Sequence, residues 1–441
     1  MFPAVFLHAT FMWLSFSADA RNVNFPPVSG VERSQQPLAN DDGVDIVTGS
    51  DFSGLMTFAN LPYANCFTAS DMDAYDIAII GAPFDTVSTP RRLAFMAVTA
   101  RPGARFGPTG IRQGSRRMSA SFGWSIYTGE NAFMSWAKIL DCGNAPLTFL
   151  DNTVALKQLH KAHKVVSGRN ANAKEKSSIP RILTLGGDHT YVVSGPVFHT
   201  STIIEVPCHM WRCFQLPVSS LEFSQNGGIT QEAEVLKPEL LSTTLPALRS
   251  AASRWGAVSV IHFDSHLDTW DPDVLGGGLS QYAGVNHGTF LHIAHEEGLI
   301  RNSSIHAGIR APLIRRKGDI RNDWRCGFDT IKARDIDRIG VDGVIKRLKE
   351  RIDSTNVYIS VDIDVLDPAF APATGTAEVG GWTTRELLSV LDGLEGMNVV
   401  GADIVEVAPI YDNPGETTVL AAAEIVHSLL TLMVQKPVKA R

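Results

Sequence analysis

The stretch Val258-Ser-Val-Ile-His-Phe-Asp-Ser-His-Leu-Asp-Thr-Trp270 decides the fold that we predict for this chain. Its first half, Val258 to Phe263, has the β-branched and aromatic composition of a buried strand in a parallel sheet. Three side chains that can bind a metal follow at a spacing of two residues: Asp264, His266 and Asp268. In an extended chain this spacing places them on one face. Because open α/β sheets bind ligands beyond the carboxyl ends of their strands, the stretch predicts a metal site at that edge.

Taken alone, this stretch is also compatible with a polar turn after a strand, but two other segments share its plan. Arg181-Ile-Leu-Thr-Leu-Gly-Gly-Asp-His-Thr190 is a short apolar strand followed by two glycines, an aspartate and a histidine. Asn356-Val-Tyr-Ile-Ser-Val-Asp-Ile-Asp-Val-Leu-Asp-Pro368 is another strand, ending in Asp362 and Asp364. Carboxylates gathered at one sheet edge repel one another unless a cation lies among them. Four carboxylates and two histidines exceed the needs of one tetrahedral zinc and predict two divalent ions, with manganese the best match.

Strands and helices alternate along the chain from about Tyr75 onward, which predicts an α/β fold with a parallel sheet flanked by helices. Apolar and β-branched runs predict strands at residues 76–80, 138–140, 181–185, 258–263, 304–309, 356–362 and 398–404. Helical spacing of apolar residues predicts helices at residues 108–118, 152–166, 244–255, 290–299, 341–352 and 417–433.

The composition narrows the class of protein further. A chain of 441 residues with 44% hydrophobic residues can bury one large core. A formal net charge of −7 argues against nucleic acid as a partner, because phosphate binding requires a basic face. Five cysteines without a Cys-x-x-Cys pair do not predict a disulfide scaffold.

The amino-terminal end has the features of a targeting segment. Met1 to Phe16 is apolar and leads into Ser17-Ala-Asp-Ala20, which predicts a signal peptide over residues 1–20 and a secreted protein. The lack of Lys and Arg near the start leaves a cytoplasmic protein as the alternative. The apolar run is too short to predict a membrane span. Residues 21–55 are rich in Pro, Asn, Asp and Ser and predict a flexible extension, followed by one catalytic domain over residues 56–436.

The three strand-end motifs together resemble the signature motifs of the ureohydrolases, the arginase and agmatinase family. These motifs are Gly186-Gly-Asp-His189, Asp264-Ser-His-Leu-Asp268 and Ser360-Val-Asp-Ile-Asp364. Supporting matches are Gly81-Ala-Pro-Phe-Asp85, Arg101-Pro-Gly-Ala-Arg-Phe-Gly107, Asn286-His-Gly-Thr289 and Val405-Glu-Val-Ala-Pro409. The resemblance is closest to the fungal-type agmatinases. It implies a three-layer α/β/α arginase-like fold with a central, mainly parallel sheet, and a homo-oligomer, either a trimer or a hexamer.

The resemblance also implies a role for each motif residue. One manganese ion would be held by His189, Asp264, Asp268 and Asp362, and the other by His266, Asp264, Asp362 and Asp364. A hydroxide between the ions would attack the carbon of a guanidinium group and release urea and an amine. Glu406 would bind the guanidinium by paired hydrogen bonds, with Asp403 as a weaker candidate for that role. His287 would pass protons to the leaving amine. Asp268 would hydrogen-bond the nucleophile. Trp270 would contact the substrate.

The loop from Thr269 to Asn286 is long and glycine-rich, and in this it resembles agmatinases more than arginases. The expected reaction is therefore hydrolysis of agmatine to putrescine and urea, with guanidinobutyrate or another small guanidino compound as the alternative substrate. Two other classes remain open: a non-catalytic family member that binds metal, and a deacetylase of the arginase fold that uses a single zinc.

Two segments interrupt the family pattern, at about residues 90–100 and 191–243. The second is roughly 50 residues long, where connections typically have about 4–6. Both are interpreted as irregular insertions, either surface loops or translated non-coding sequence. We expect Thr190 and Thr244 to lie close in space, so that the second insertion leaves and returns at one point. Among the remaining histidines, His262 lies inside its strand and is expected to be a packed core residue, whereas His292 and His295 are expected to be structural or solvated.

Overall fold

A computed structural model of the chain describes residues 54–67, 73–85, 101–148, 152–177, 179–189, 243–275 and 286–439. In these residues eight strands form one sheet in the order β2-β1-β3-β8-β7-β4-β5-β6, and every neighbouring pair runs parallel. The strands are β1 Ile77–Gly81, β2 Ile139–Asn144, β3 Arg181–Leu185, β4 Ser259–Phe263, β5 Ser304–Ile309, β6 Phe328–Lys332, β7 Asn356–Asp362 and β8 Asn398–Val405.

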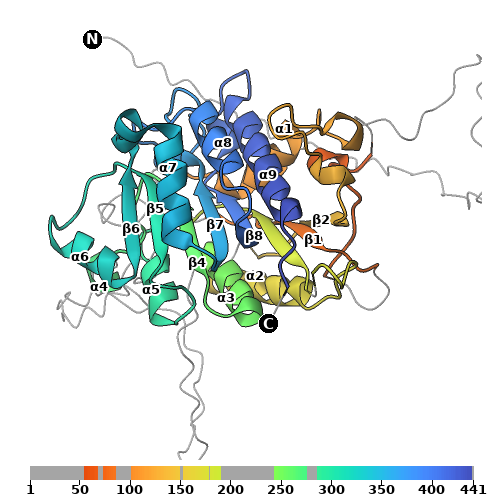
Figure 1. The fold of residues 1–441 in the computed structure, drawn as a ribbon, viewed down its shortest axis with the longest axis horizontal. Coiled ribbons are helices and arrows are strands. Elements are labelled where there is room, and N and C mark those ends of the chain that lie inside the picture. The colour runs from red at the N-terminus through yellow and green to blue at the C-terminus, as the bar shows by residue number, and fades with distance from the viewer. Residues whose placement is uncertain are drawn as a thin grey trace, which may run out of the picture. The chain divides into compact units, whose positions relative to one another are not determined.

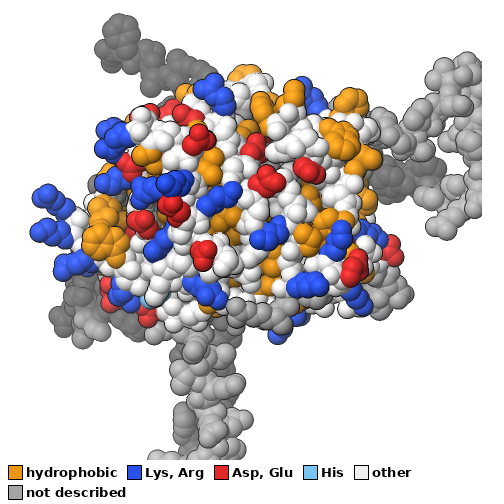
Figure 2. Space-filling model, viewed as in Figure 1, with side chains coloured by type: hydrophobic (Ala, Val, Ile, Leu, Met, Phe, Trp, Pro, Cys, Tyr) orange, Lys and Arg blue, Asp and Glu red, His pale blue; other side chains and the backbone are white. Residues whose placement is uncertain are grey.

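Helices cover both faces of this sheet. They are α1 Gly107–Gly114, α2 Asn152–Ser167, α3 Thr244–Trp255, α4 Pro272–Leu275, α5 Phe290–Glu296, α6 Gly318–Arg325, α7 Ile336–Ile352, α8 Thr384–Asp392 and α9 Thr417–Gln435. In Figure 1, α7, α8 and α9 lie side by side in front of the sheet. Figure 2 shows basic and acidic side chains interspersed over that front face. Both the predicted fold class and the predicted three-layer arrangement are confirmed.

Side chains that alternate along each strand explain the two hydrophobic layers. In β1, Ile77 and Ile79 join the cluster that contains α7, α8 and α9, whereas Ala78 and Ile80 join the cluster with α2, α3 and α5. In β4, Ile261 and Phe263 pack toward the first of these layers. A strand buried on both faces has an almost continuous apolar sequence, which is why these strands can be recognised in the sequence.

The order of the strands determines where the functional side chains meet. The strands β3, β8, β7 and β4 are contiguous at the centre of the sheet. Because they are parallel, their carboxyl ends open at the same edge. The three ligand motifs predicted from the sequence, together with the segment that contains Glu406, therefore converge at one place.

The sequence pattern did not reveal every element. Strand β6 lies at the edge of the sheet, and its residues Asp329 and Thr330 are half-buried, so it lacks the apolar run of a central strand. The helices α6 and α8 were also not predicted. A capping box between Thr383 and Glu386 marks the start of α8 and is a sequence signal that was available.

Helix α9 is long and apolar enough to cross a membrane by length and composition. However, 72% of its most apolar window is buried inside the protein, where it packs against β8, α1 and α8. Its composition is therefore accounted for by its position in the core.

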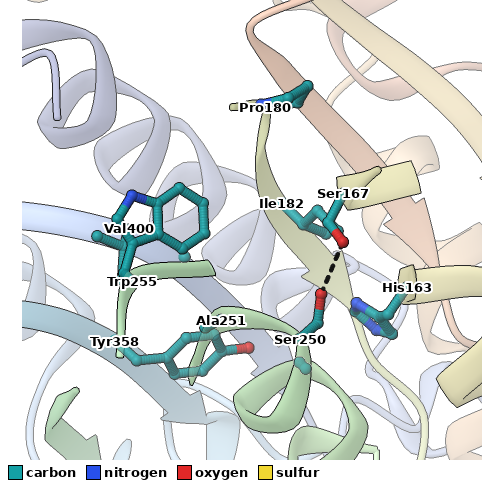
Figure 3. A pocket seen from close by; sticks show the side chains of 11 residues that line it. His163, Ser167, Pro180, Ile182, Ser250, Ala251, Trp255, Tyr358 and Val400 are labelled. Atoms are coloured by element: carbon teal, nitrogen blue, oxygen red, sulfur yellow. Dashed lines mark hydrogen bonds between the residues drawn. The ribbon is translucent and has the colours of Figure 1, made fainter. Parts of the chain in front are cut away.

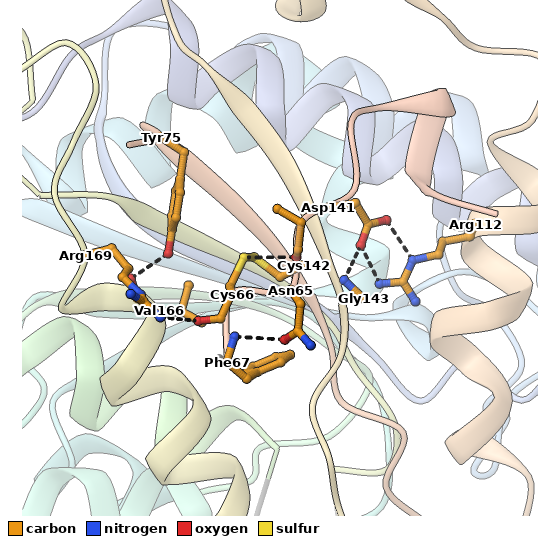
Figure 4. The surroundings of a disulfide bond; sticks show 11 residues. Asn65, Cys66, Phe67, Tyr75, Arg112, Asp141, Cys142, Gly143, Val166 and Arg169 are labelled. Carbon is orange, nitrogen blue, oxygen red and sulfur yellow. Dashed lines mark hydrogen bonds and ion pairs between the residues drawn. A yellow bond between two sulfur atoms is a disulfide. The ribbon is translucent and has the colours of Figure 1, made fainter. Parts of the chain in front are cut away.

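A disulfide and a buried ion pair tie the segment before β1 to the edge of the sheet (Figure 4). Cys66 and Cys142 are bonded, with their Cα atoms 5.3 Å apart. Next to Cys142, the Asp141 carboxylate accepts hydrogen bonds of 2.8 Å from both Nε and Nη2 of Arg112. It also accepts one of 2.7 Å from the backbone N–H of Phe58. The segment is thus held by one covalent bond and one charged hydrogen-bond cluster.

A small cavity of about 10 Å³ lies between α2, α3 and the sheet (Figure 3). His163, Ser167, Ser250 and Tyr358 are among its lining residues, and Ser250 and Ser167 are joined by a hydrogen bond of 3.1 Å. Burial lowers the pKa of His163 to about 3, so its imidazole is neutral. A space of this size holds no more than about one water molecule. We therefore assign this cavity no substrate-binding role.

The ends of the long predicted insertion are in contact. The Thr243 hydroxyl donates a hydrogen bond of 2.6 Å to the carbonyl oxygen of Asp188, and Thr244 Oγ1 lies 3.0 Å from His189 Nε2. Thr190, the predicted insertions and the predicted signal peptide lie outside the described residues, as does the amino-terminal extension up to residue 53. The described flanks thus leave and return at one point of the molecule.

We predict that replacing residues 193–240 with a short glycine-serine linker leaves the fold intact. The flanks already touch, and the entropic cost of loop closure grows only logarithmically with loop length. Thermal unfolding should show a midpoint equal to or above that of the intact chain. A glycine-serine segment of the original length is the matched control. Loss of manganese binding in the shortened chain would show instead that this segment helps to build the metal cleft.

Candidate metal centre

Two groups of buried histidine and carboxylate side chains lie at the carboxyl edge of the central strands. In the first, His189 Nδ1 lies 3.2 Å from Asp362 Oδ2, 3.4 Å from Asp268 Oδ2 and 3.9 Å from Asp264 Oδ2. In the second, His266 Nδ1 lies 3.1 Å from Asp364 Oδ2 and 3.2 Å from Asp264 Oδ1. The two oxygens of Asp264 thus face different groups.

All six residues predicted as ligands from the sequence are therefore brought together. Asp264 contacts both groups, as the resemblance implied, whereas the contacts of Asp362 with a ligand histidine are those with His189 alone among the described residues. Five of the six are fully buried, and His266, with its side chain 15% exposed, lies on the open side of the site. Among the six residues, His266 is therefore the one with the greatest solvent exposure.

The electrostatics of the groups favour bound cations. Burial, together with the nearby carboxylates of Asp364 and Asp264, raises the pKa of Asp362 well above its usual range. Burial and the Asp264 carboxylate raise the pKa of Asp268 to about 6. Carboxyl groups so placed give up their protons readily only when a positive charge lies among them.

Several polar atoms that face the centre have no hydrogen-bond partner within the described residues. They are His189 Nδ1, His262 Nε2, Asp264 Oδ2, Asp268 Oδ1, His287 Nδ1 and Glu406 Oε2. Buried polar atoms normally have partners, because leaving one unpaired costs about 1–3 kcal/mol. Nitrogen and oxygen atoms directed at a common point fit divalent metal ions. The residues present therefore fit a binuclear metal centre.

Two glycines allow the His189 loop to lie against its neighbours. A Cβ atom on Gly187 would come within 2.0 Å of the carbonyl oxygen of Phe84. One on Gly186 would come within 2.5 Å of the Val405 side chain. A larger residue would clash at either position, which explains why the motif has two glycines.

Two of the predicted catalytic residues have left-handed backbone conformations. Asp268 has φ of 55° and Glu406 has φ of 61°. Such conformations are uncommon for residues other than glycine and concentrate at functional sites. Here each one directs a carboxylate to the centre from a turn that follows a strand.

Glu406 lies beside the first group. Its Oε1 accepts a hydrogen bond of 2.5 Å from the backbone N–H of His189, whereas Oε2 has no partner within the described residues. Burial and the nearby carboxylates of Asp188 and Asp362 raise its pKa well above the usual range. A bound cation, such as a guanidinium, would lower the pKa of Glu406 again, because it stabilises the ionised carboxylate.

The other predicted substrate and catalytic residues have different surroundings. Burial, and then the nearby His266, lower the pKa of His287 to about 4. Trp270 is buried, and its ring packs closely against Gly288. A Cβ atom at position 288 would lie only 2.5 Å from that ring. His292 lies apart from the centre and contacts Asn322.

Asp403 has a supporting position that the sequence analysis did not predict. Asp403, the weaker candidate for guanidinium binding, accepts hydrogen bonds from Tyr358 and Ser360 and also contacts Thr244. Thr244 in turn lies 3.0 Å from His189 Nε2. Asp403 is fully buried in the sheet, and through Thr244 it supports the predicted ligand His189. The sequence signal for this supporting role was the position of Asp403 inside the strand, two residues before Val405. An acidic residue within a strand seldom reaches the edge of the sheet where ligands bind.

His262 differs in part from its expected role. It is buried, as expected of a packed core residue. However, its Nε2 lies 3.1 Å from Asp264 Oδ2, so its ring faces the metal-binding groups. The spacing of two residues between His262 and Asp264 placed both side chains on one face of the strand, and this signal was available in the sequence.

Comparisons with known proteins agree with this geometry. The Arginase family model matches residues 75–197 and 242–431, and the gap falls within the predicted long insertion. The Schizosaccharomyces pombe protein named "Putative agmatinase 1" is 44% identical over 396 residues, covering 88% of this chain and 84% of that protein. An agmatinase of Escherichia coli is 30% identical, covering 87% of this chain and 95% of that protein.

A solved structure with the same architecture is that of a proclavaminate amidino hydrolase from Streptomyces clavuligerus. It has a TM-score of 0.64 and 27% identity, and the match covers 88% of this chain and 99% of that one. An arginase from Bacillus subtilis, at 23% identity and a TM-score of 0.52, shares the fold. The motifs, the all-parallel sheet and the matched length agree, and the chain belongs to the arginase family of ureohydrolases.

Proposed function

We propose that the protein is a binuclear manganese hydrolase that cleaves agmatine to putrescine and urea. The observation that carries this proposal is the pair of buried His–carboxylate groups that share Asp264, with the unpaired Oε2 of Glu406 next to them. When bound, two divalent ions supply a water nucleophile that is activated at neutral pH. His189, Asp264, Asp268 and Asp362 would hold one ion, and His266, Asp264, Asp362 and Asp364 the other.

The chain's own residues would position the substrate and move the protons. Glu406 Oε2 is free to accept an N–H from the guanidinium, while Oε1 remains fixed by the backbone of His189. Asp268 Oδ1 is free to orient the attacking water. His287 Nδ1 has no hydrogen-bond partner within the described residues, and its imidazole would pass a proton to the departing amine.

The choice of agmatine among guanidino compounds rests on the open side of the site. Glu378 lies there, with its Oε1 3.9 Å from His266 Nε2 and its side chain 34% exposed. A carboxylate at the entrance favours a substrate with a cationic far end over one that carries a carboxylate there. Agmatine has such an amine, and the relatives named as agmatinases support the same substrate. The part of the Thr269–Asn286 loop at residues 276–285 lies outside the described residues.

The first prediction from this proposal concerns the reaction. Purified protein loaded with manganese should release urea from agmatine faster than from guanidinobutyrate or arginine. Metal analysis of the same sample should find near two manganese ions per chain. Failure to release urea from any of these three substrates would refute the proposal. A content of one ion or none would favour a non-catalytic metal-binding protein.

A second prediction concerns Glu406→Gln. A hydrogen bond to a charged group contributes about 1.5–3 kcal/mol, so kcat/KM for agmatine should fall by about 10- to 100-fold. The amide oxygen can still accept the bond from His189, so manganese binding and thermal stability should be unchanged. Glu424→Gln, which removes an exposed carboxylate on α9, is the control for loss of one negative charge. Activity equal to that of the control would assign guanidinium binding to another residue.

We also propose that the chain matures in the secretory pathway and that it assembles as a trimer or hexamer. The apolar segment before Ala20 and the Cys66–Cys142 disulfide both support the first of these, since disulfides persist mainly in oxidising compartments. Protein isolated from its natural source should begin at Arg21. A non-reducing digest should contain the two cysteine peptides cross-linked. An intact Met1 together with free thiols at both positions would indicate a cytoplasmic protein.

A further inference from the structure

Large apolar side chains lie exposed in the segment that follows α1. Their exposed fractions range from 62% to 90%, and they are Phe122, Trp124, Ile126, Tyr127 and Met134. All five belong to residues 119–134, the apolar loop. Figure 2 shows hydrophobic side chains at the upper right of the molecule, where Figure 1 places this part of the chain. None of the five takes part in the metal centre, so the chemistry of that centre does not explain their exposure.

The apolar loop is held in place by its own hydrogen bonds. The backbone N–H of Ser125 donates to the carbonyl oxygen of Glu130 at 2.8 Å, and the N–H of Gly129 donates to the carbonyl oxygen of Ser125 at 2.9 Å. The Asn131 side chain donates to the carbonyl oxygen of Ala120 at 2.9 Å. A loop that is already ordered loses little conformational freedom on association, so it can bind a partner at a low entropic cost.

The extent of this exposed apolar surface matches that of a protein interface. If side chains of this size offer about 150–200 Å² each, the five together expose on the order of 600–750 Å². Monomeric proteins seldom expose apolar patches larger than a few hundred Å². A specific protein complex buries about 800 Å² on each partner, and tryptophan and tyrosine are enriched among the residues that dominate binding. The apolar loop therefore has the area and the residue types of a surface that a protein partner covers.

A hollow of about 250 Å³ lies beside the exposed side chains. The apolar loop contributes Trp124 and Tyr127 to its lining, and the helices contribute Leu388 on α8 and His427 on α9. One face of the molecule thus carries both protruding side chains and a depression. Such a face can pack against a copy of itself, because the protrusion of each copy can enter the depression of the next around a closed ring.

The charges next to the apolar side chains favour a protein partner over a membrane or a nucleic acid. Arg117 and Glu130 are both exposed and carry opposite charges, and Asp392 lines the hollow. Anionic membranes and nucleic acids attract basic surfaces. Protein interfaces instead have an apolar centre with a polar rim, and a rim of both signs can pair with a copy of itself.

We infer that a second copy of this chain packs on this face, with the apolar loop of one copy against the hollow between the apolar loop, α8 and α9 of the next. The area, the shape and the mixed charges of the face all fit this occupant. The inference rests on the assembly proposed above, for which it names the surface, and it does not depend on the metal centre.

A comparison of Trp124→Glu with Trp324→Glu in the full chain tests this inference. Both tryptophans are 64% exposed, and Trp324 lies on α6, which packs on β6 at the edge of the sheet opposite β2. An unpaired charge within the interface should raise the dissociation constant of the assembly by about 100-fold or more. Sedimentation velocity should therefore show Trp124→Glu dissociated at concentrations where the unsubstituted chain and Trp324→Glu remain assembled. Equal assembly of the two variants, or a monomeric unsubstituted chain, would overturn the inference.

Photo-cross-linking decides the question even if Trp124→Glu fails to fold. A benzoylphenylalanine in place of Ile126 is introduced into ¹⁵N-labelled chains, which are assembled with unlabelled chains and irradiated. The cross-linked peptides should join a labelled to an unlabelled chain and should end on α8 or α9. Cross-links within single chains only would overturn the inference. Manganese content and urea release, measured on the same sample, report on the proposed reaction separately.

Discussion

The mutual repulsion of carboxylates buried at one edge of a sheet is the constraint on which this structure depends. Burial and neighbouring acids raise the pKa of Asp362, Asp268 and Glu406. Such a cluster needs positive charge among its members, and the nearby His189 and His266 provide part of it. Under the proposed function, metal ions and a cationic substrate would provide the rest, so that the cost of burying these carboxylates would favour binding of a guanidinium.

A site of this kind requires rigid supports, because ligand atoms must be placed to within about half an ångström. The supports come from the sheet itself. Gly186 and Gly187 let the His189 loop pack against adjacent backbone, and Asp403 fixes Thr244 beneath the His189 ring. Asp268 and Glu406, which follow β4 and β8, have left-handed backbone conformations.

The fold class could be predicted from the sequence because its central strands are buried on both faces. Val258 to Phe263 and Asn356 to Val361 consist mostly of β-branched and aromatic residues, which predicts inner strands of a parallel sheet. Edge strand β6 was missed for the complementary reason: Asp329 and Thr330 remain half-buried, and the segment has no apolar run. The six ligand candidates were also identifiable, because strand-end acids and histidines at a spacing of two residues have few structural explanations.

The sequence by itself thus determined the chemistry of this protein: its ligand types, their spacing on each strand, and the family to which they point. Only the tertiary structure decided which strands are neighbours. The order β3-β8-β7-β4 brings Glu406 to the backbone N–H of His189, a contact between positions more than 200 residues apart in the chain. It also brings Asp403 to Thr244, which lies against His189 Nε2. The tertiary structure also decided that His262 faces the metal-binding groups, backed by His306 and Asp323. The two-residue period of a strand determines on which face of the sheet a side chain lies. Its contacts on that face depend on which strands are neighbours, and sequence spacing does not encode this.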